Sequence, residues 1–280
     1  MTDFRVGEPV RVAGNQVPVM RIVGRNAGPM TGAGTNTYLV GSKQLALIDP
    51  GPSDDVAMDS IVAAIGKRKL KRVLVTHTHG DHSPAATPIA RKFSAELIGL
   101  PPPESGNHDR SFSPDRDYKA GEILDCGEFT IELIHTPGHV SNHFCYLLQE
   151  EKLLFTGDHI LQGTTSVILP PDGNMSDYMA SLDELLKMDL NFLAPGHGHI
   201  MNAPAKAIEA LIAHRMAREK KIVSALKELG SSTLDKLTLK VYDDVAPHLI
   251  PWAKLTLEAH LIKLRKDSKV EELNQRWKLL

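Results

Sequence analysis

This chain of 280 residues has little of several features that mark specialised classes of protein. Its two cysteines, Cys126 and Cys145, form no CxxC motif and are too few for a disulfide framework, so we expect buried thiols in a reducing compartment. A formal net charge of -2 provides no global attraction to nucleic acid or membranes. No apolar run approaches membrane-spanning length, and no secretory signal is visible at the N-terminus. The composition predicts a cytoplasmic protein without a membrane partner.

The apolar segments and the turns between them predict an α/β fold with some antiparallel strand pairs. A hydrophobic content of 42% is enough to bury a sizeable core. Strands are expected over 17–23, 37–40, 45–48, 71–76, 95–99, 129–135, 144–148, 152–156 and from 192 onward. Helices are expected over 54–67, with Ser53 as the N-cap, and over 84–93 and 176–188. A long surface loop is expected over 101–117.

The character of the chain changes near residue 204, which predicts two domains, 1–204 and 205–280. A long helix over 205–229 that ends at Gly230, a short helix from 231, another helix from Pro251 and a tail from 269 indicate a winged-helix-like module. We expect Trp252 and Leu257 in its core, because they have helical spacing.

Positive charge is concentrated in the second of these regions. Residues 215–280 carry 14 Lys and Arg against 9 Asp and Glu, a net charge of +5, while the remainder carries −7. A solvated helical face and a surface that contacts nucleic acid both fit this modest excess.

The densest group of polar side chains lies directly after the apolar run 73–75. Thr76-His77-Thr78-His79-Gly80-Asp81-His82 places three imidazoles and a carboxylate within seven residues. A solitary histidine is usually solvated or hydrogen-bonded, but three packed together without a metal would leave many polar nitrogens to satisfy. Imidazole nitrogen and carboxylate oxygen are ordinary ligands of divalent metals, so this segment predicts a metal site.

Three later segments also place His or Asp beside glycine after an expected strand. They are 136–139, which ends in His139, 156–159, which contains Asp158, and 194–198, which contains His197. Glycine allows the backbone to approach a ligand closely, and loops at strand ends often carry sites. Of the other histidines, those beside candidate ligands are expected to support them or to be solvated, namely His135, His143, His159 and His199. No role in metal binding is expected for His108, His214, His248 and His260.

These motifs resemble those of the metallo-β-lactamase superfamily over residues 20–200: His-x-His-x-Asp-His followed by separate His, Asp and His positions. The resemblance implies a four-layer αββα sandwich that holds two divalent metal ions. The implied ligands of one ion are His77, His79 and His139, those of the other are Asp81, His82 and His197, and Asp158 bridges the two ions. Asp49 matches an early aspartate that orients ligands without binding the metal.

A centre of this kind implies hydrolysis. Two ions would hold a bridging water and lower its pKa from about 16 toward about 7, and they would polarise a carbonyl or phosphoryl oxygen of the substrate. Asp81 is the expected catalytic residue, because it could steer the proton of the nucleophile. Zinc suits the imidazole-rich set, although iron and manganese can occupy similar ligands. Asn36 could offer its amide to a substrate, or it could serve a turn.

The substrate stays open between two activities. The segments 31–40 and 47–52, together with the C-terminal region, resemble the β-lactamase-like protein 2 group, which implies a single-stranded RNA endonuclease. Related proteins imply the alternative, a thioester or lactone hydrolase similar to glyoxalase II or to an acyl-carrier thioesterase. A non-catalytic nucleic-acid-binding module is a third hypothesis, but a purely structural metal site needs only four ligands and not seven.

Overall fold

The computed structural model describes residues 4–280. The first three residues of the N-terminal segment, where no secretory signal is expected, lie outside the described residues. The chain forms two compact units. The first contains the residues up to Thr136, with Asn142–Ser166 and Met188–Pro204, and the second contains Pro137–Ser141, Val167–Lys187 and Ala205–Leu280. These compact units are defined by contacts and combine separate segments, whereas the predicted domains are continuous stretches of sequence. The division at residue 204 therefore stays a prediction.

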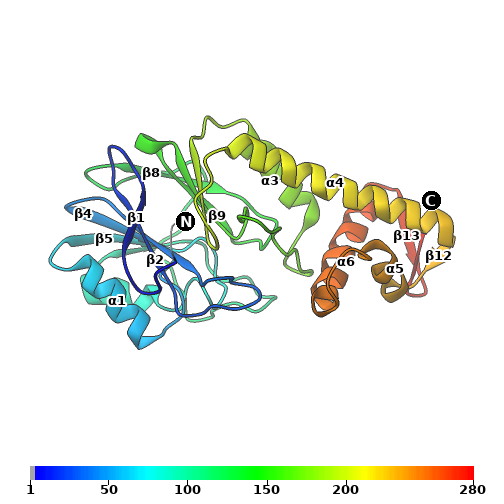
Figure 1. The fold of residues 1–280 in the computed structure, drawn as a ribbon, viewed down its shortest axis with the longest axis horizontal. Coiled ribbons are helices and arrows are strands. Elements are labelled where there is room, and N and C mark those ends of the chain that lie inside the picture. The colour runs from blue at the N-terminus through cyan, green and yellow to red at the C-terminus, as the bar shows by residue number, and fades with distance from the viewer. Residues whose placement is uncertain (1–3) are drawn as a thin grey trace. The chain divides into compact units, whose positions relative to one another are not determined.

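The first unit contains a six-stranded sheet with the strand order β1-β2-β3-β4-β5-β6. Figure 1 labels β1, β2, β4 and β5 of this sheet. Its strands are β1 Val10–Ala13, β2 Val19–Val23, β3 Asn36–Val40, β4 Gln44–Ile48, β5 Lys69–Leu74 and β6 Glu96–Ile98. The strands from β1 to β4 pair antiparallel, whereas β5 runs parallel to both β4 and β6. The connections between these parallel strands contain helices, as parallel pairing requires.

A second sheet in the same unit has the order β11-β10-β9-β8-β7. Its strands are β7 Ile123–Asp125, β8 Thr130–His135, β9 Phe144–Leu148, β10 Leu153–Gly157 and β11 Phe192–Pro195, and the short helix η1 Gln149–Glu151 connects β9 to β10. Only β10 and β11 pair parallel in this sheet. The strands β1 and β7 are absent from the sequence prediction; both are edge strands with few buried side chains.

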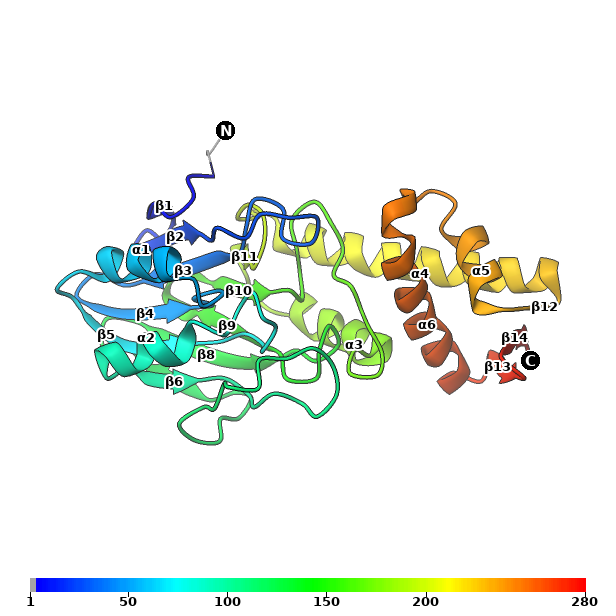
Figure 2. The same ribbon diagram turned by 90° about the horizontal axis from the view of Figure 1, so that it is seen from below.

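The core of the first unit lies in two layers. One layer joins the facing sides of the two sheets, with Tyr38 of one sheet and Phe155 of the other among its side chains. The other layer joins the opposite face of the six-stranded sheet to α1 Asp55–Ile65 and α2 Ala86–Phe93, which lie on that face (Figure 2). Burial on both faces explains why Leu45–Ile48 and Val73–Val75 are apolar without interruption.

Helix α1 begins one residue later than the sequence suggested. Ser53 was expected to cap it, but the structure assigns this role to Asp54, whose carboxylate accepts a hydrogen bond from the Ala57 amide at 2.8 Å. A carboxylate is an equally good N-cap acceptor, and its negative charge also suits the positive end of the helix dipole.

The second unit contains four helices and a small sheet among its described residues. The helices are α3 Met175–Leu186, α4 Pro204–Leu229, α5 Leu234–Val241 and α6 Ile250–Lys266, and the short turn η2 Pro247–Leu249 precedes α6. The strands are β12 Ser231–Ser232, β13 Val270–Leu273 and β14 Arg276–Leu279, in the order β12-β14-β13. Helices α4, α5 and α6 share a core with the β13–β14 hairpin, which corresponds to the wing.

Two sequence expectations were wrong in this unit. The short helix begins at Leu234 and not at Ser231, because Ser231–Ser232 pair with β14 and Thr233 then caps the helix through the Lys236 amide. Trp252 was expected in the core together with Leu257. Leu257 is fully buried, but Trp252 is 40% exposed. Within residues 4–280, no helix combines the length and apolar character needed to cross a membrane.

Candidate metal centre

Four loops of the first unit carry candidate site residues, and each loop follows the end of a strand. Because β4 and β5 are parallel, Asp49 and the segment Thr76–His82 leave the same end of the six-stranded sheet. Because β10 and β11 are parallel, Asp158 and His197 likewise leave one end of the other sheet. The carboxyl ends of parallel strands therefore collect these side chains, as they do in many α/β proteins.

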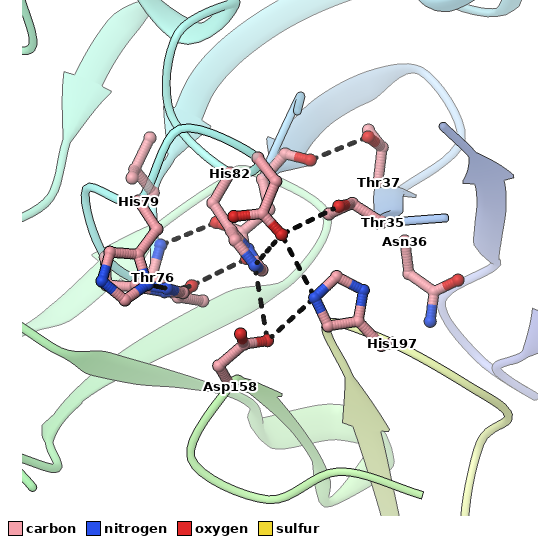
Figure 3. Close-up of polar contacts among 12 residues, drawn as sticks. Thr35, Asn36, Thr37, Thr76, His79, His82, Asp158 and His197 are labelled. Carbon is pink, nitrogen blue, oxygen red and sulfur yellow. Dashed lines mark hydrogen bonds and ion pairs between the residues drawn. The ribbon is translucent and has the colours of Figure 1, made fainter. Parts of the chain in front are cut away.

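Two imidazoles and two carboxylates face one common point (Figure 3). His82 Nε2 lies 3.4 Å from Asp81 Oδ2 and 3.3 Å from Asp158 Oδ1. His197 Nε2 lies 3.3 Å from each of the same two oxygens. Two nitrogens and two oxygens thus alternate around a single point.

The four nitrogen–oxygen separations of 3.3–3.4 Å are compatible with tetrahedral coordination. Atoms at the corners of a regular tetrahedron with edges of this length lie about 2.0–2.1 Å from its centre, which is the bond length of zinc to imidazole nitrogen or carboxylate oxygen. In addition, His82 Nε2 is buried and has no hydrogen-bond partner among residues 4–280. A buried nitrogen without a partner is costly unless a cation uses its lone pair. The residues of this set therefore fit a divalent metal ion.

A second set lies beside the first and shares Asp158 with it. His77, His79 and Asp158 each offer one ligand atom, and these atoms lie within 4.8 Å of one another. His77 Nε2 is 3.0 Å from His79 Nδ1, and the two rings meet edge to face at 4.6 Å between centroids. One carboxylate next to two sets of imidazoles is the arrangement that a bridging ligand requires.

Asp49 orients both sets although it lies outside them. One of its oxygens accepts a hydrogen bond from the Thr76 amide at 2.7 Å, and the other lies 2.7 Å from the Thr76 hydroxyl and 2.9 Å from His82 Nδ1. An ionised carboxylate can only accept, so His82 carries its proton on Nδ1 and presents the lone pair of Nε2. The Thr76 oxygen also lies 3.1 Å from His77 Nδ1. One carboxylate thereby holds two ligand-bearing positions.

The carboxylates decide the charge of the two imidazoles. Burial opposes a charge on His197, yet Asp158 and Asp81 raise its pKa to about 9. Burial also opposes a charge on His82, but Asp81, Asp158 and Asp49 raise its pKa well above the ordinary value. Burial would raise the pKa of Asp158, whereas His197 and His82 hold it well below its usual range. The cluster stabilises positive charge, which a divalent ion would supply in place of these protons.

His139 lies on the segment Pro137–Ser141, which belongs to the second unit. Its Nδ1 lies 2.6 Å from the Val167 carbonyl oxygen, an acceptor, so Nδ1 carries the proton and the lone pair is on Nε2. At Gly138, a Cβ would lie only 2.3 Å from Cα of Tyr178, and its φ is +143°. The ring tautomer suits metal binding, and glycine is required beside it by the close approach of α3.

Comparison with known proteins decides the family. Residues 30–197 match the model of the metallo-β-lactamase superfamily, which is more than half of the chain. The chain belongs to the metallo-β-lactamase superfamily. Residues 233–277 also match the β-lactamase-associated winged helix domain, so the α5–α6 region and its wing are confirmed as a winged helix. As a member of this superfamily, the chain is a hydrolase.

Curated relatives extend the similarity over most of the chain. A β-lactamase-like protein 2 homolog from Caenorhabditis elegans is 34% identical over 90% of this chain and 86% of its own length. An atrochrysone carboxyl ACP thioesterase from Aspergillus chevalieri is 32% identical over 90% of this chain and 82% of its own length. The predicted resemblance to the β-lactamase-like protein 2 group is therefore confirmed.

The solved structures confirm the predicted fold class. A β-lactamase domain protein from Burkholderia ambifaria superimposes with a TM-score of 0.82 at 18% sequence identity, covering 98% of this chain and 94% of that protein. At this identity the likeness concerns the fold alone.

Within this superfamily fold, Asn36 holds the loop that carries His197. Its amide Nδ2 donates to the carbonyl oxygens of Pro195 and Gly198, each at 2.9 Å, and its backbone N–H donates to the Gly196 carbonyl at 2.7 Å. The hydroxyl of Tyr38 donates to the same Pro195 oxygen at 2.8 Å. Both side chains are buried. Asn36 therefore positions the His197 loop, which is a different use of its amide from the substrate contact considered above.

Gly196 allows the His197 loop to pass beside the other ligands. A Cβ at this position would lie 2.7 Å from both Asp158 Oδ1 and His82 Cε1. Only glycine fits this approach without moving a candidate ligand. Steric exclusion of any larger side chain thus explains the glycine in the motif Pro195-Gly196-His197.

Sequence reasoning missed two supporting residues. Thr76 is fully buried and connects Asp49 to His77. Its sequence signal is that a threonine also stands directly before Pro137 and before Gly157 in two of the other motifs. His108 was assigned no metal role, yet its ring stacks on that of His79 at 5.1 Å between centroids, and its Nδ1 lies 2.9 Å from the Thr78 hydroxyl. No local pattern reveals that contact, because His108 comes from the predicted surface loop 101–117.

Proposed function

We propose that this chain is a two-metal hydrolase of acyl thioesters. The observation that carries the choice of substrate is the likeness, over nine-tenths of this chain, to a relative named as an acyl-carrier-protein thioesterase. Breaking a thioester requires a nucleophilic water and stabilisation of negative charge on the carbonyl oxygen, which are the two tasks that a two-ion centre performs.

We assign the ligands as the sequence motif predicts. His77, His79 and His139 would hold one ion, Asp81, His82 and His197 would hold the other, and Asp158 would bridge them. Six of these seven residues belong to the two sets described within the first unit. We propose zinc for both ions, because imidazole dominates the donors and the spacing around His82 suits zinc bond lengths.

When bound, the ions would supply a water of lowered pKa and Lewis-acid polarisation of the thioester carbonyl. Asp81, whose side chain is 28% exposed, would accept the proton of the attacking water. The new carbon–oxygen bond forms first, the carbon–sulfur bond then breaks, and the proton passes to the departing thiolate. Thr35, whose hydroxyl lies 3.4 Å from Asp81 Oδ2, would help to orient the carboxylate for this transfer.

Thiol release from an acyl thioester by the zinc-loaded protein tests the proposal. His79→Ala should abolish turnover, whereas the matched variant His248→Ala changes an exposed histidine of the second unit and should retain it. Elemental analysis should find about two ions per chain. Full activity in a metal-free preparation would overturn the proposal.

A second candidate is cleavage of single-stranded RNA, which the match to a winged helix domain and the charge of +5 over residues 215–280 favour. The ion pairs of this region weaken the case, since most of its cations have an acidic partner. The pairs include Arg218–Asp244, Lys221–Asp243, Lys240–Glu228, Lys254–Asp235, Arg265–Glu272 and Lys278–Glu271. A neutralised surface releases few counterions from a phosphate backbone, so its RNA affinity should be low.

Salt dependence distinguishes the two candidates. If the region grips RNA, replacing Lys263, Arg265 and Lys266 by alanine should weaken oligonucleotide binding and flatten its dependence on salt by about one logarithmic unit for each phosphate that is no longer neutralised. Thioester turnover together with inert RNA would exclude the nuclease. RNA cleavage that is abolished in His79→Ala, without thioester turnover, would replace our first proposal by the second.

A further inference from the structure

The second unit contains a pocket whose purpose the metal centre does not explain. Its volume is about 420 Å³, within the size range of pockets that bind small molecules. One wall is the segment that leads into α3, and the other wall is one face of α6. The lining residues are Pro170, Pro171, Gly173, Asn174, Met175, Glu258, Ala259 and Ile262. Apolar side chains and two polar groups therefore share one cavity.

The two polar groups of the pocket have complementary hydrogen-bonding capacity. Glu258 makes no hydrogen bond or ion pair with any residue in the range 4–280, so its carboxylate remains an available acceptor. Asn174 uses Oδ1 to cap α3 through the Ser176 and Asp177 amides, which leaves its Nδ2 as the available donor. One acceptor and one donor between apolar walls match an amide group, which offers one N–H and one C=O.

The same groups disfavour a phosphate. An unpaired carboxylate repels an anion, and the N-terminal amides of α3 are already capped by Asn174. A strand of nucleic acid would have to bring phosphates past Glu258. The pocket therefore suits an uncharged, flexible chain that carries amides.

The wall of this pocket continues to the segment that carries His139. Val167, at the start of the wall segment, accepts the hydrogen bond from the His139 ring at 2.6 Å. Asn174, at its end, donates its backbone N–H to the carbonyl of Gly138, the residue before His139, at 2.8 Å. The segment 167–175 thus contacts the candidate metal-binding loop at both ends and lines the pocket between them.

We propose that this pocket binds the amide-bearing arm of the thioester substrate, an arm of the pantetheine class. This inference rests on the proposed thioester hydrolysis. Apolar contacts with Met175, Ala259 and Ile262 would hold the methylene groups, while Glu258 accepts from an amide N–H of the arm and Asn174 donates to its carbonyl. The pocket would confer preference for substrates with an arm over short thioesters.

Calorimetric titration of pantetheine into the full chain tests binding without relying on turnover. Ile262 is 36% exposed, so Ile262→Trp should fill the pocket without disturbing the core, and it should weaken pantetheine binding at least about tenfold. Glu258→Lys removes the acceptor and should weaken binding by a similar factor. Leu239→Trp, at a position that is 65% exposed on α5 of the same unit, is the matched control and should bind as the wild type does.

Kinetics adds a second measurement with two substrates that share an acyl group, S-acetylpantetheine and the acetyl thioester of mercaptoethanol. Ile262→Trp should lower the ratio of their kcat/KM values at least about tenfold in favour of the short substrate, mainly through KM. An unchanged ratio, or equal binding of pantetheine to the wild type and Ile262→Trp, would overturn the inference. So would displacement of pantetheine by a single-stranded oligoribonucleotide. If pantetheine binds this pocket but neither thioester is hydrolysed, the proposed function fails and the arm-binding pocket stands.

Discussion

At the scale of single residues, much of the candidate centre depends on side chains that would not bind metal themselves. Asp49 is 2% exposed and contacts both Thr76 and His82. Its backbone has a φ of +48°, an uncommon conformation for a residue other than glycine, which the surrounding contacts must maintain. The carboxylate acts on the metal site through the orientation and basicity of its neighbours.

We predict that Asp49→Asn weakens metal binding by about 10–100-fold, because both carboxylate oxygens accept hydrogen bonds and an amide replaces one of these acceptors by a donor. Competition with a chelator of known affinity would measure the effect. Asp189→Asn removes an exposed carboxylate that pairs with Lys152 and should leave metal affinity unchanged. Equal affinity in Asp49→Asn and the wild type would show that Asp49 does not orient the ligands.

Gly196→Ala should also disturb the centre, for a steric reason. The new methyl group would meet Asp158 Oδ1 and His82 Cε1, so we expect metal content after dialysis to fall from about two ions toward about one per chain. Gly80→Ala is a control within the ligand-bearing segment, since a Cβ there has no neighbour within 4 Å. Elemental analysis of both variants would check this, and full occupancy in Gly196→Ala would refute it.

The candidate ligands could be proposed from sequence, because imidazoles and carboxylates at this density are costly to bury unless they bind a metal. His82 and His197 lie far apart in the chain, yet both belong to the predicted set and both lie beside Asp158. The role of Asn36 could not be decided from sequence, because an asparagine amide can bind either a substrate or the backbone of a loop. Its hydrogen bonds to Pro195 and Gly198 distinguish the two roles.

At the scale of helices and strands, long periodic segments were well predicted and short ones were not. The strand β9 matches its predicted bounds, and α4 differs from them by one residue. In contrast, Ser231–Ser232 formed a strand because β14, from a distant part of the chain, supplied the pairing partner. Local propensity cannot reveal an element that depends on such a partner.

The ion pair between Arg218 of α4 and Asp244, which follows α5, should make the stability of the second unit depend on pH. A hydrogen bond from Arg218 lowers the pKa of Asp244 from 3.8 to about 2. The stabilisation is therefore complete above the ordinary pKa and is lost as the pH falls through about 2. Because the Asp244 side chain is 57% exposed, we expect Asp244→Asn to lower the free energy of unfolding by at most about 1 kcal/mol at pH 7.

Denaturant unfolding between pH 7 and pH 2 would measure this effect. The difference between Asp244→Asn and the wild type should shrink as the carboxyl becomes protonated. Glu209→Gln, an exposed residue of α4 without an ion pair among residues 4–280, should show no such dependence. A difference that persists unchanged at pH 2 would contradict the role of this ion pair.

At the scale of the whole molecule, the positive charge of residues 215–280 is more evident in the sequence than on the surface of the folded chain. The excess of +5 over residues 215–280 suggested a nucleic-acid contact, but the cations are mostly paired with acidic residues of the same region. Exposed pairs of this kind contribute little stability, yet they reduce the electrostatic attraction of a polyanion. Net charge alone overstated the basic character of this surface.

Removal of metal should destabilise the first unit. Without an ion, the free-energy cost of burying these imidazoles and carboxylates around one point is less well offset. An ion present at a hundred times its dissociation constant would stabilise the fold by about 2.7 kcal/mol. A chelator should therefore lower the Tm measured by calorimetry, and added zinc should restore it. A Tm that does not change with chelator or zinc would argue against metal ions bound at these residues.

The sequence by itself determined the family, the order of the longer helices and strands and the candidate ligands, because residue type and long apolar periodicity are local properties of the chain. Only the tertiary structure decided that Asp158 lies between two sets of imidazoles, that Asp49 contacts both Thr76 and His82, and that a pocket with Glu258 and Asn174 lies between α6 and the segment before α3. These features depend on distances between segments far apart in the chain, and packing of the two sheets and of the helices sets those distances.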